Sequence, residues 1–171
     1  MRRASAWGKH LFHHYVGGPV VHVHLGLYGG PDPLRSDANP SSAWSRITKS
    51  RRPIGALLMD QTVIAGVGNV YRNELLFRHR IDPQRPGRGI GEPEFDAAWN
   101  DLVSLMKVGL RRGKIIVVRP EHDHGLPSYL PDRPRTYVYR RAGEPCRVCG
   151  GVIRTALLEG RNVFWCPVCQ T

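Results

Sequence analysis

Residues 146–169 read CRVCGGVIRTALLEGRNVFWCPVC, and they hold all four cysteines of the 171-residue chain. Cys146 and Cys149 form one Cys-x-x-Cys pair, and Cys166 and Cys169 form the other. Each pair can form a tight turn that directs two sulfurs to one point, and two such turns supply the four thiolates of a tetrahedral Zn²⁺ site. The spacing therefore predicts one zinc ion bound by these four cysteines.

The predicted zinc is structural, because all four ligands are protein groups and no coordination position is left for a catalytic water. The alternatives are two disulfides or a redox-active Cys-x-x-Cys. A secretory signal would favour the first and a thioredoxin-like βαβ unit the second, and we find neither pattern in the sequence.

The charge of the chain indicates a polyanionic partner. Lys and Arg total 25 against 14 Asp and Glu, which gives a formal charge of +11 and a pI near 10.2. In a chain with 41% hydrophobic residues, this excess points first to nucleic acid. Apolar runs such as residues 57–59 and 115–118 are too short to span a membrane. We therefore expect a cytoplasmic protein that does not bind membranes and that is nucleoid-associated if its source is bacterial.

The pattern of apolar residues changes along the chain. Residues 8–18 and 19–29 alternate as two β-strands around a Gly17-Gly18-Pro19 turn. Turn-forming residues fill positions 30–39, and helical spacing follows. Pro53 is expected in the first turn of one helix, and the strongest helical pattern runs from Pro93 to Gly113.

The segment Gly66-Val67-Gly68-Asn69 precedes another predicted helix. The first turn of a helix has free backbone amides that attract phosphate, and an asparagine side chain there can donate a further hydrogen bond. The alternative is an ordinary turn in which Asn69 only caps the helix.

Three stretches of the sequence resemble the formamidopyrimidine-DNA glycosylase and endonuclease VIII (Fpg/Nei) family. MDQTVIAGVGNVYRNELLF at 59–77 resembles its helix-two-turns-helix segment, and residues 137–170 resemble its C-terminal zinc finger, including Gly160-Arg161. AWGKHLFHHYVGGPVVHVHLGLYG at 6–29 is similar to its early strands. The pair Leu27-Tyr28 resembles the endonuclease VIII branch more than the formamidopyrimidine branch.

The resemblance implies roles for residues that would otherwise be ordinary surface or strand residues. It makes Lys9 a DNA contact and the proton donor for β-elimination, and it assigns Arg161 to the DNA backbone near the lesion and to δ-elimination. It places Gly68 and Asn69 at a phosphate, and Leu27 and Tyr28 in the duplex after the damaged base has left the stack. Without the resemblance, Lys9 reads as a solvated charge and Leu27 as a plain strand residue.

The expected fold class is α+β with three parts. They are a partial β-sandwich remnant at 1–29, a helical helix-two-turns-helix DNA-binding domain at 30–140 and a C-terminal zinc-finger β-hairpin at 141–171. We expect a monomer. The resemblance implies a DNA repair glycosylase and abasic-site lyase that excises oxidised bases from duplex DNA.

Two rival functions stay open at this point. One is a non-catalytic, damaged-DNA-binding zinc protein, and the other is an RNA-binding zinc-ribbon protein. The first gains support where the chain departs from the family, which uses an N-terminal proline as nucleophile and a glutamate beside it. This chain has Met1-Arg2-Arg3 there, and part of the family's β-sandwich is expected to be missing at Gly29-Gly30.

We therefore predict that this chain binds abasic DNA without acting as a glycosylase. The family's route needs an unprotonated amine near neutral pH, which an α-amino group with a pKa of about 7.7–8.0 supplies and an ordinary lysine at about 10.4 does not. Here the α-amino group is the primary amine of Met1 with no glutamate beside it, and the resemblance implies that the strand that would bring it to the sugar is absent. Borohydride trapping on a duplex with an oxidised pyrimidine tests this. A covalent adduct would show that another amine reacts, and Lys9 would be the first to examine.

Overall fold

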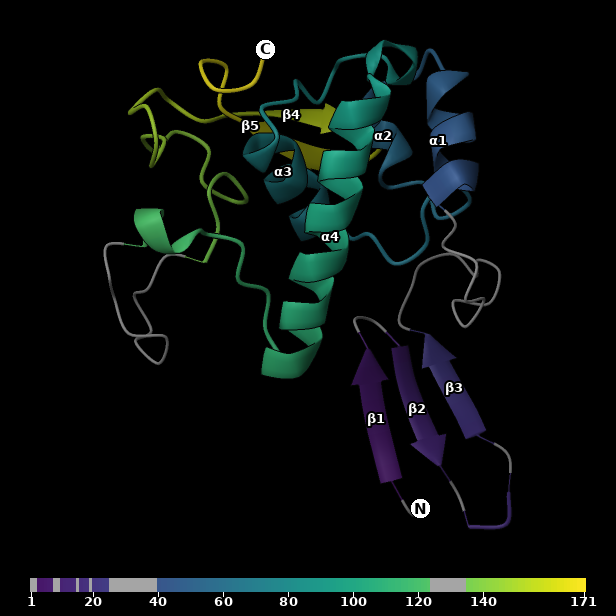
Figure 1. Ribbon diagram of the computed structural model, residues 1–171. Helices are drawn as coiled ribbons and strands as arrows, with labels where there is room; N and C mark the ends of the chain where they lie inside the picture. The colour runs from purple at the N-terminus through teal and green to yellow at the C-terminus, as the bar shows by residue number, and fades with distance from the viewer. Residues whose placement is uncertain (1–2, 8–9, 15, 19, 25–39, 124–134) are drawn as a thin grey trace. The chain divides into compact units, whose positions relative to one another are not determined.

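The computed structural model describes residues 3–7, 10–14, 16–18, 20–24, 40–123 and 135–171. The chain divides into two compact units, Met1–Arg35 and Ser36–Thr171 (Figure 1). The second unit holds the helical segment and the zinc finger together. The boundaries at residues 29, 140 and 141 stay predictions.

The first unit is a three-stranded antiparallel sheet in the order β1 (Arg3–Trp7), β2 (His10–His14), β3 (Val20–His24). The two predicted strands correspond to β2 and β3, and Gly17 in the turn between them has a φ of 68°. Strand β1 was not predicted from the sequence. Its sequence, RASAW, offers small residues and an arginine instead of the β-branched alternation that marks a strand.

Four α-helices form the larger part of the second unit: α1 (Pro40–Thr48), α2 (Ile54–Leu57), α3 (Asn69–Arg78) and α4 (Glu92–Arg112). Two short 3-10 helices, η1 (Gly87–Gly89) and η2 (Pro120–His122), lie in the connections. Pro53 is expected within the first turn of a helix, but it precedes α2 as the N-cap. A proline fixes its own φ and so suits this entry position.

Helix α4 begins and ends close to the residues predicted from the sequence. The Glu94 carboxylate accepts a hydrogen bond from the Gly91 amide at 3.3 Å, and Pro93 lies in the first turn. Arg111 and Arg112 in the last turn complement the helix dipole. The helix ends at Gly113, whose φ of 64° is the left-handed conformation that glycine adopts without strain.

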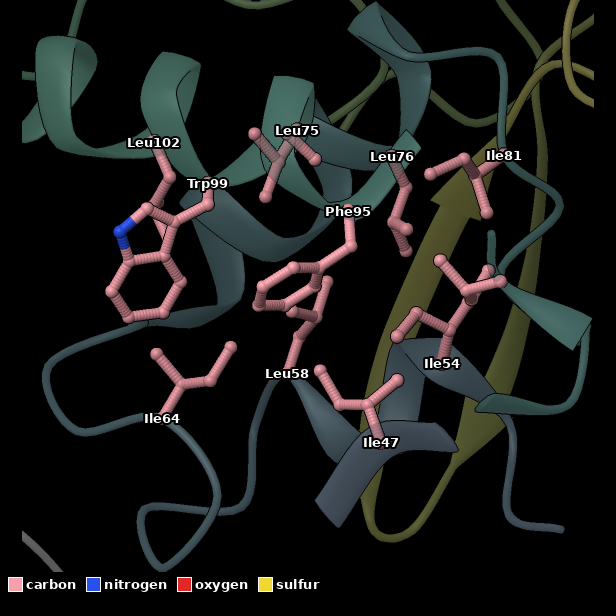
Figure 2. A pocket seen from close by; sticks show the side chains of 12 residues that line it. Ile47, Ile54, Leu58, Ile64, Leu75, Leu76, Ile81, Phe95, Trp99 and Leu102 are labelled. Atoms are coloured by element: carbon pink, nitrogen blue, oxygen red, sulfur yellow. The ribbon is translucent and has the colours of Figure 1, made fainter. Parts of the chain in front are cut away.

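The main hydrophobic core lies among the four helices (Figure 2). The ring of Phe95 lies 5.2 Å from that of Trp44 and 5.8 Å from that of Trp99. A cavity of about 30 Å³ remains between the apolar side chains, which include Ile47, Ile64 and Leu102. Its lining is almost entirely apolar, so it belongs to the packing and offers no polar groups to orient a ligand.

A second core joins α3 to the C-terminal hairpin, which is formed by β4 (Arg154–Leu158) and β5 (Arg161–Trp165). The rings of Phe77 and Tyr137 stack at 4.7 Å, and Phe164 and Ile153 are buried beside them. Figure 1 shows the hairpin alongside α3. The expected α+β class with a C-terminal zinc-finger hairpin is therefore confirmed.

The C-terminal end of α3 is fastened to α4 and to the chain beyond it. Arg78 donates to Asp101 through Nε at 2.6 Å and Nη2 at 2.7 Å, and its Nη1 donates to the Val117 carbonyl at 2.6 Å. Burial opposes ionisation of Asp101, but hydrogen bonds from His79 and Arg78 outweigh it and hold the pKa of this carboxyl well below its usual range.

Glu74 on α3 is fully buried and accepts three backbone hydrogen bonds. The amides of Tyr137, Val138 and Tyr139 donate to its two oxygens at 2.6, 3.0 and 2.8 Å. Burial raises the pKa of the carboxyl, and the three amide donors oppose that rise. Three donors around two oxygens suit a carboxylate, which accepts only, and they fix the segment that leads into the zinc finger.

None of the helices among the described residues combines the length and apolarity that crossing a membrane requires.

We predict that Glu74→Gln destabilises the protein by about 2–4 kcal/mol, because the new NH₂ group would face backbone amides that also donate. Urea denaturation with zinc present measures this. Glu92→Gln on exposed α4 surface is the matched control and should shift the free energy of unfolding by no more than about 1 kcal/mol, the range for a first-turn acidic residue at the helix dipole. Equal effects of the two substitutions would contradict the role assigned to Glu74.

Candidate nucleic-acid interface and metal centre

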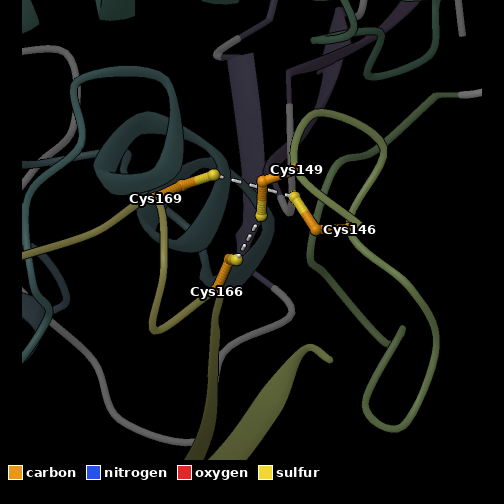
Figure 3. A group of neighbouring side chains, drawn as sticks. All are labelled: Cys146, Cys149, Cys166 and Cys169. Carbon is orange, nitrogen blue, oxygen red and sulfur yellow. Dashed lines mark hydrogen bonds between the residues drawn. The ribbon is translucent and has the colours of Figure 1, made fainter. Parts of the chain in front are cut away.

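The four cysteines converge as the sequence predicts (Figure 3). Their sulfur atoms all lie within 4.8 Å of one another. The Sγ atoms of Cys146 and Cys169 are 3.9 Å apart, and those of Cys149 and Cys166 are 3.4 Å apart. A tetrahedral zinc with Zn–S bonds of about 2.3 Å places its sulfurs about 3.8 Å apart, so the four thiols fit this ion.

Backbone amides donate hydrogen bonds to two of the four sulfurs. The Gly151 amide donates to Cys149 Sγ at 3.4 Å, and the Val148 amide donates to Cys146 Sγ at 3.5 Å. The Gly151 hydrogen bond is the main cause that lowers the pKa of Cys149 to about 7. With four thiolate ligands, the zinc that this finger binds is structural.

Arg141 fastens the start of the finger from within. Its guanidinium donates to the Glu144 carboxylate at 2.8 Å and to the backbone carbonyls of Tyr137 and Pro145 at 2.5 and 2.8 Å. The side chain is almost fully buried, so these hydrogen bonds replace water on a charge that would otherwise be costly to bury. Hydrogen bonds to Glu74 therefore fix residues 137–139 on α3, and hydrogen bonds from Arg141 fix the two ends of the segment 137–145 to each other.

The N-terminal end of α3 carries Gly68 and Asn69, the two residues predicted to face a phosphate. Gly68 is the N-cap, and the first helical hydrogen bond runs from the Arg72 amide to its carbonyl at 3.0 Å. The amides that precede Arg72 in this first turn therefore have no acceptor within the helix. Such amides, with the positive end of the helix dipole, favour an anion.

Hydrogen bonds fix the orientation of the Asn69 amide. Its Oδ1 accepts from Arg72 Nη2 and from Asn73 Nδ2, so the oxygen faces the protein. Its Nδ2 donates to the Asn162 carbonyl at 3.2 Å. An amide nitrogen has two N–H groups, and Asn162 is the one acceptor that the described residues provide, so the second N–H is available to a ligand.

The same group of residues ties α3 to β5. Arg72 donates through Nη2 to the Asn162 carbonyl at 2.8 Å, and Asn73 accepts from the Phe164 amide at 2.7 Å. Asn162 follows Arg161 in β5, so these contacts bring the two regions predicted to bind DNA, Asn69 and Arg161, to one place.

Arg72 belongs to this group of residues, although the sequence did not predict it as a site residue. It is fully buried, and burial lowers its pKa to about 10, with the charge of Arg161 contributing. This pKa keeps Arg72 protonated at neutral pH, so a buried cation lies close to Arg161 and strengthens the positive potential there. An arginine within an otherwise ordinary helix sequence gives no signal of burial, so its role needed the tertiary contacts.

The loop before α3 is organised by Gln61, a second residue without a sequence signal. Its Oε1 accepts from the Gly66 amide at 2.9 Å, and its Nε2 donates to the Val67 carbonyl at 3.0 Å. Gly66 has a φ of 86°, a conformation that favours glycine. The other predicted site residues, Lys9, Leu27 and Tyr28, lie outside the described residues.

Two family models match the chain. The formamidopyrimidine-DNA glycosylase H2TH domain matches residues 29–120, and the zinc finger found in FPG and IleRS matches residues 143–171. The chain is 76% identical to "Endonuclease 8 1" of Mycobacterium tuberculosis, over the whole chain and 84% of that protein. This alignment covers 225 residues of the relative, more than the 171 of this chain, so parts of the relative have no counterpart here.

Solved structures agree with the sequence relatives. The Fpg protein of Thermus thermophilus superposes with a TM-score of 0.65 at 32% identity, over 88% of this chain and 60% of that one. Wild-type Lactococcus lactis Fpg, in complex with DNA containing an oxidised pyrimidine, matches with a TM-score of 0.63 at 25% identity, over 83% and 50%. This chain therefore spans only 60% of the first solved structure and 50% of the second.

The H2TH match over more than half of the chain, the identity to the mycobacterial enzymes and the geometry of the finger lead to one conclusion. The chain belongs to the formamidopyrimidine-DNA glycosylase and endonuclease VIII family of DNA repair proteins.

Proposed function

We propose that this chain binds duplex DNA at a damaged base or an abasic site, and that it is the DNA-binding part of an endonuclease VIII-type activity. That activity excises oxidised bases and nicks the resulting abasic site. The observation that carries the proposal is the contact between the N-terminal end of α3 and β5, in which the side chains of Asn69 and Arg72 both donate to the Asn162 carbonyl.

The proposed binding site contacts the DNA backbone through the N-terminal end of α3, Asn69 and Arg161, and we call this set of contacts the grip. The free amides of the first turn of α3 and the second N–H of Asn69 donate to one phosphate, and the guanidinium of Arg161 contacts the backbone beside it. Phosphate contacts set the register of a protein on DNA, and each charged contact releases counterions. The excess positive charge of the chain adds long-range attraction to the duplex.

Relatives support the choice of ligand. The L. lactis Fpg complex contains DNA with an oxidised pyrimidine, and the mycobacterial relative is named an endonuclease 8. We therefore propose an oxidised pyrimidine as the first lesion to test. The rival RNA-binding zinc ribbon is suggested by basicity alone, and the segments Gly66 to Asn69 and Gly160-Arg161 oppose it.

We propose the remaining roles from the family resemblance. Leu27 and Tyr28 fill the gap that the extruded base leaves, which offsets part of the few kcal/mol of unstacking. Lys9 contacts the DNA and supplies the proton for β-elimination, and Arg161 supplies the proton for δ-elimination.

We also propose that the 171-residue chain binds without excising the base, that it is a monomer and that it acts in the cytoplasm on the nucleoid.

The grip predicts different salt dependences for its two side chains. Arg161→Ala should weaken binding to an abasic-site duplex and lower the magnitude of the slope of log K against log salt by roughly 0.9. Asn69→Ala should weaken binding without changing the slope, because the lost group is neutral. Fluorescence anisotropy titrations between about 50 and 200 mM salt cover the useful range.

Arg154→Ala is the matched control for charge, since Arg154 lies in the same hairpin at the opposite end from the turn. Asn100→Ala, on exposed α4 surface, is the control for the amide. If Arg161→Ala binds as tightly as the parent chain, the role carried over to Arg161 is wrong.

Removal of zinc should abolish specific binding, because the metal holds the hairpin that presents Arg161. In chelator-treated protein and in Cys166→Ser, we expect the preference for abasic over intact duplex to be lost. Added Zn²⁺ should restore it in the treated parent, and added Mg²⁺ should not. Full preference in protein shown to be zinc-free by elemental analysis would contradict this account.

A further inference from the structure

The turn between β4 and β5 has an unusual residue for its conformation. Leu158 pairs with Arg161, so the connection is the two-residue loop Glu159-Gly160. Glu159 has a φ of 46° and Gly160 a φ of 75°. Positive φ at both central residues is typical of a type I′ turn, in which the first position favours Asn, Asp or Gly. Glutamate is therefore a poor conformational choice here, and its side chain offers a reason for its presence.

That side chain is held by an arginine from a distant part of the sequence. Arg52 donates through Nε to Glu159 Oε1 at 3.1 Å and through Nη2 to Oε2 at 2.7 Å. This is the bidentate geometry in which a guanidinium restrains both the distance and the direction of a carboxylate. The contact joins the entry to α2 with the tip of the zinc finger.

Arg52 is itself fixed in place. Its Nη1 donates to Asp60 Oδ2 at 2.8 Å, and Asp60 Oδ1 accepts from the Thr62 amide and hydroxyl at 3.0 and 2.6 Å. Its backbone carbonyl accepts from the Gly87 amide at 2.9 Å. We call the bidentate contact between Arg52 and Glu159 the clamp. It is anchored in the helical segment that leads to Asn69.

Stability does not account for this arrangement. The side chains of Arg52 and Glu159 are 43% and 50% exposed, and ion pairs of this kind contribute only about 0–1 kcal/mol. Glu159 also places a negative charge two residues from Arg161, where a DNA-binding surface would gain from its absence. An acidic residue at this position is explained if Arg52 neutralises its charge and the resulting ion pair has a role in binding.

We propose that Arg52 is a positioning residue that acts through Glu159. It fixes the Glu159-Gly160 turn and so holds Arg161 in the direction needed to grip the DNA backbone at an abasic site. Arg52 reaches the carboxylate and does not contact the phosphate. The inference rests on the proposed function, because it assumes that Arg161 binds DNA.

The sign of one effect tests the clamp. Removing a negative charge from a DNA-binding surface ordinarily strengthens binding. Under the clamp, Glu159→Gln instead weakens binding to an abasic-site duplex by roughly three- to fivefold, the upper range for an exposed ion pair. It also lowers the ratio of affinities for abasic and intact duplex. If Arg52 were a phosphate ligand, Glu159→Gln would free it and strengthen binding.

Two further variants complete the experiment, which uses the full zinc-containing chain. In an Arg52→Gln background, Glu159→Gln should cause no further weakening, because the clamp is already open. Arg52→Lys keeps the charge but loses the bidentate contact, and it should weaken abasic binding as Glu159→Gln does. Glu92→Gln is the control for loss of an exposed carboxylate. Zinc content and circular dichroism show that each variant is folded.

Glu159→Gln or Arg52→Lys binding abasic DNA as tightly as the parent would overturn the clamp. Arg161→Ala in the same assay separates this failure from that of the proposed function. Weak binding by Arg161→Ala with an unaffected Glu159→Gln leaves the proposed function standing and removes the clamp. Unaffected binding by Arg161→Ala removes both.

Discussion

The buried polar face of α3 is the feature on which the rest of the second unit depends. Asn73 and Glu74 are fully buried, and they accept hydrogen bonds from backbone amides of β5 and of residues 137–139. Each hydrogen bond of this kind stabilises the protein by only about 0.5–1.5 kcal/mol when made, but each buried group left unpaired costs about 1–3 kcal/mol. The finger therefore has one low-energy position on α3, and the helix that presents Asn69 also determines where Arg161 lies.

Zinc and the Arg52–Glu159 ion pair restrain the hairpin at two further points. The metal closes the base of the hairpin through four cysteines, while the ion pair holds its tip to the helical segment. Between them, the α3 contacts hold the middle of β5. A hairpin restrained at its base, middle and tip presents Arg161 in a defined direction, which is what the proposed contact with the DNA backbone requires.

Local patterns allowed the sequence to predict the zinc site, helix α4 and the position of Asn69 at a helix start. Cysteine spacing, helical periodicity ending at Gly113 and a glycine-rich turn are each signals carried by one continuous segment of about 25 residues or fewer. The partners of Glu74, Arg72 and Arg52 could not be predicted in this way. Arg52 and Glu159 are 107 residues apart, and a charged residue that will be buried or paired by tertiary contact looks like any surface charge.

Native-state hydrogen exchange is the most direct test of the claim that α3 and the finger form one cooperative body. The decisive amide is that of Phe164, which donates to Asn73 Oδ1 at 2.7 Å across the contact. The account predicts that this amide exchanges with the same opening free energy as buried amides of α3, such as that of Leu76, in ¹⁵N-labelled zinc-bound protein. Exchange of the Phe164 amide through a separate, lower-energy opening, while α3 stays protected, would show that the finger moves independently and would contradict the account.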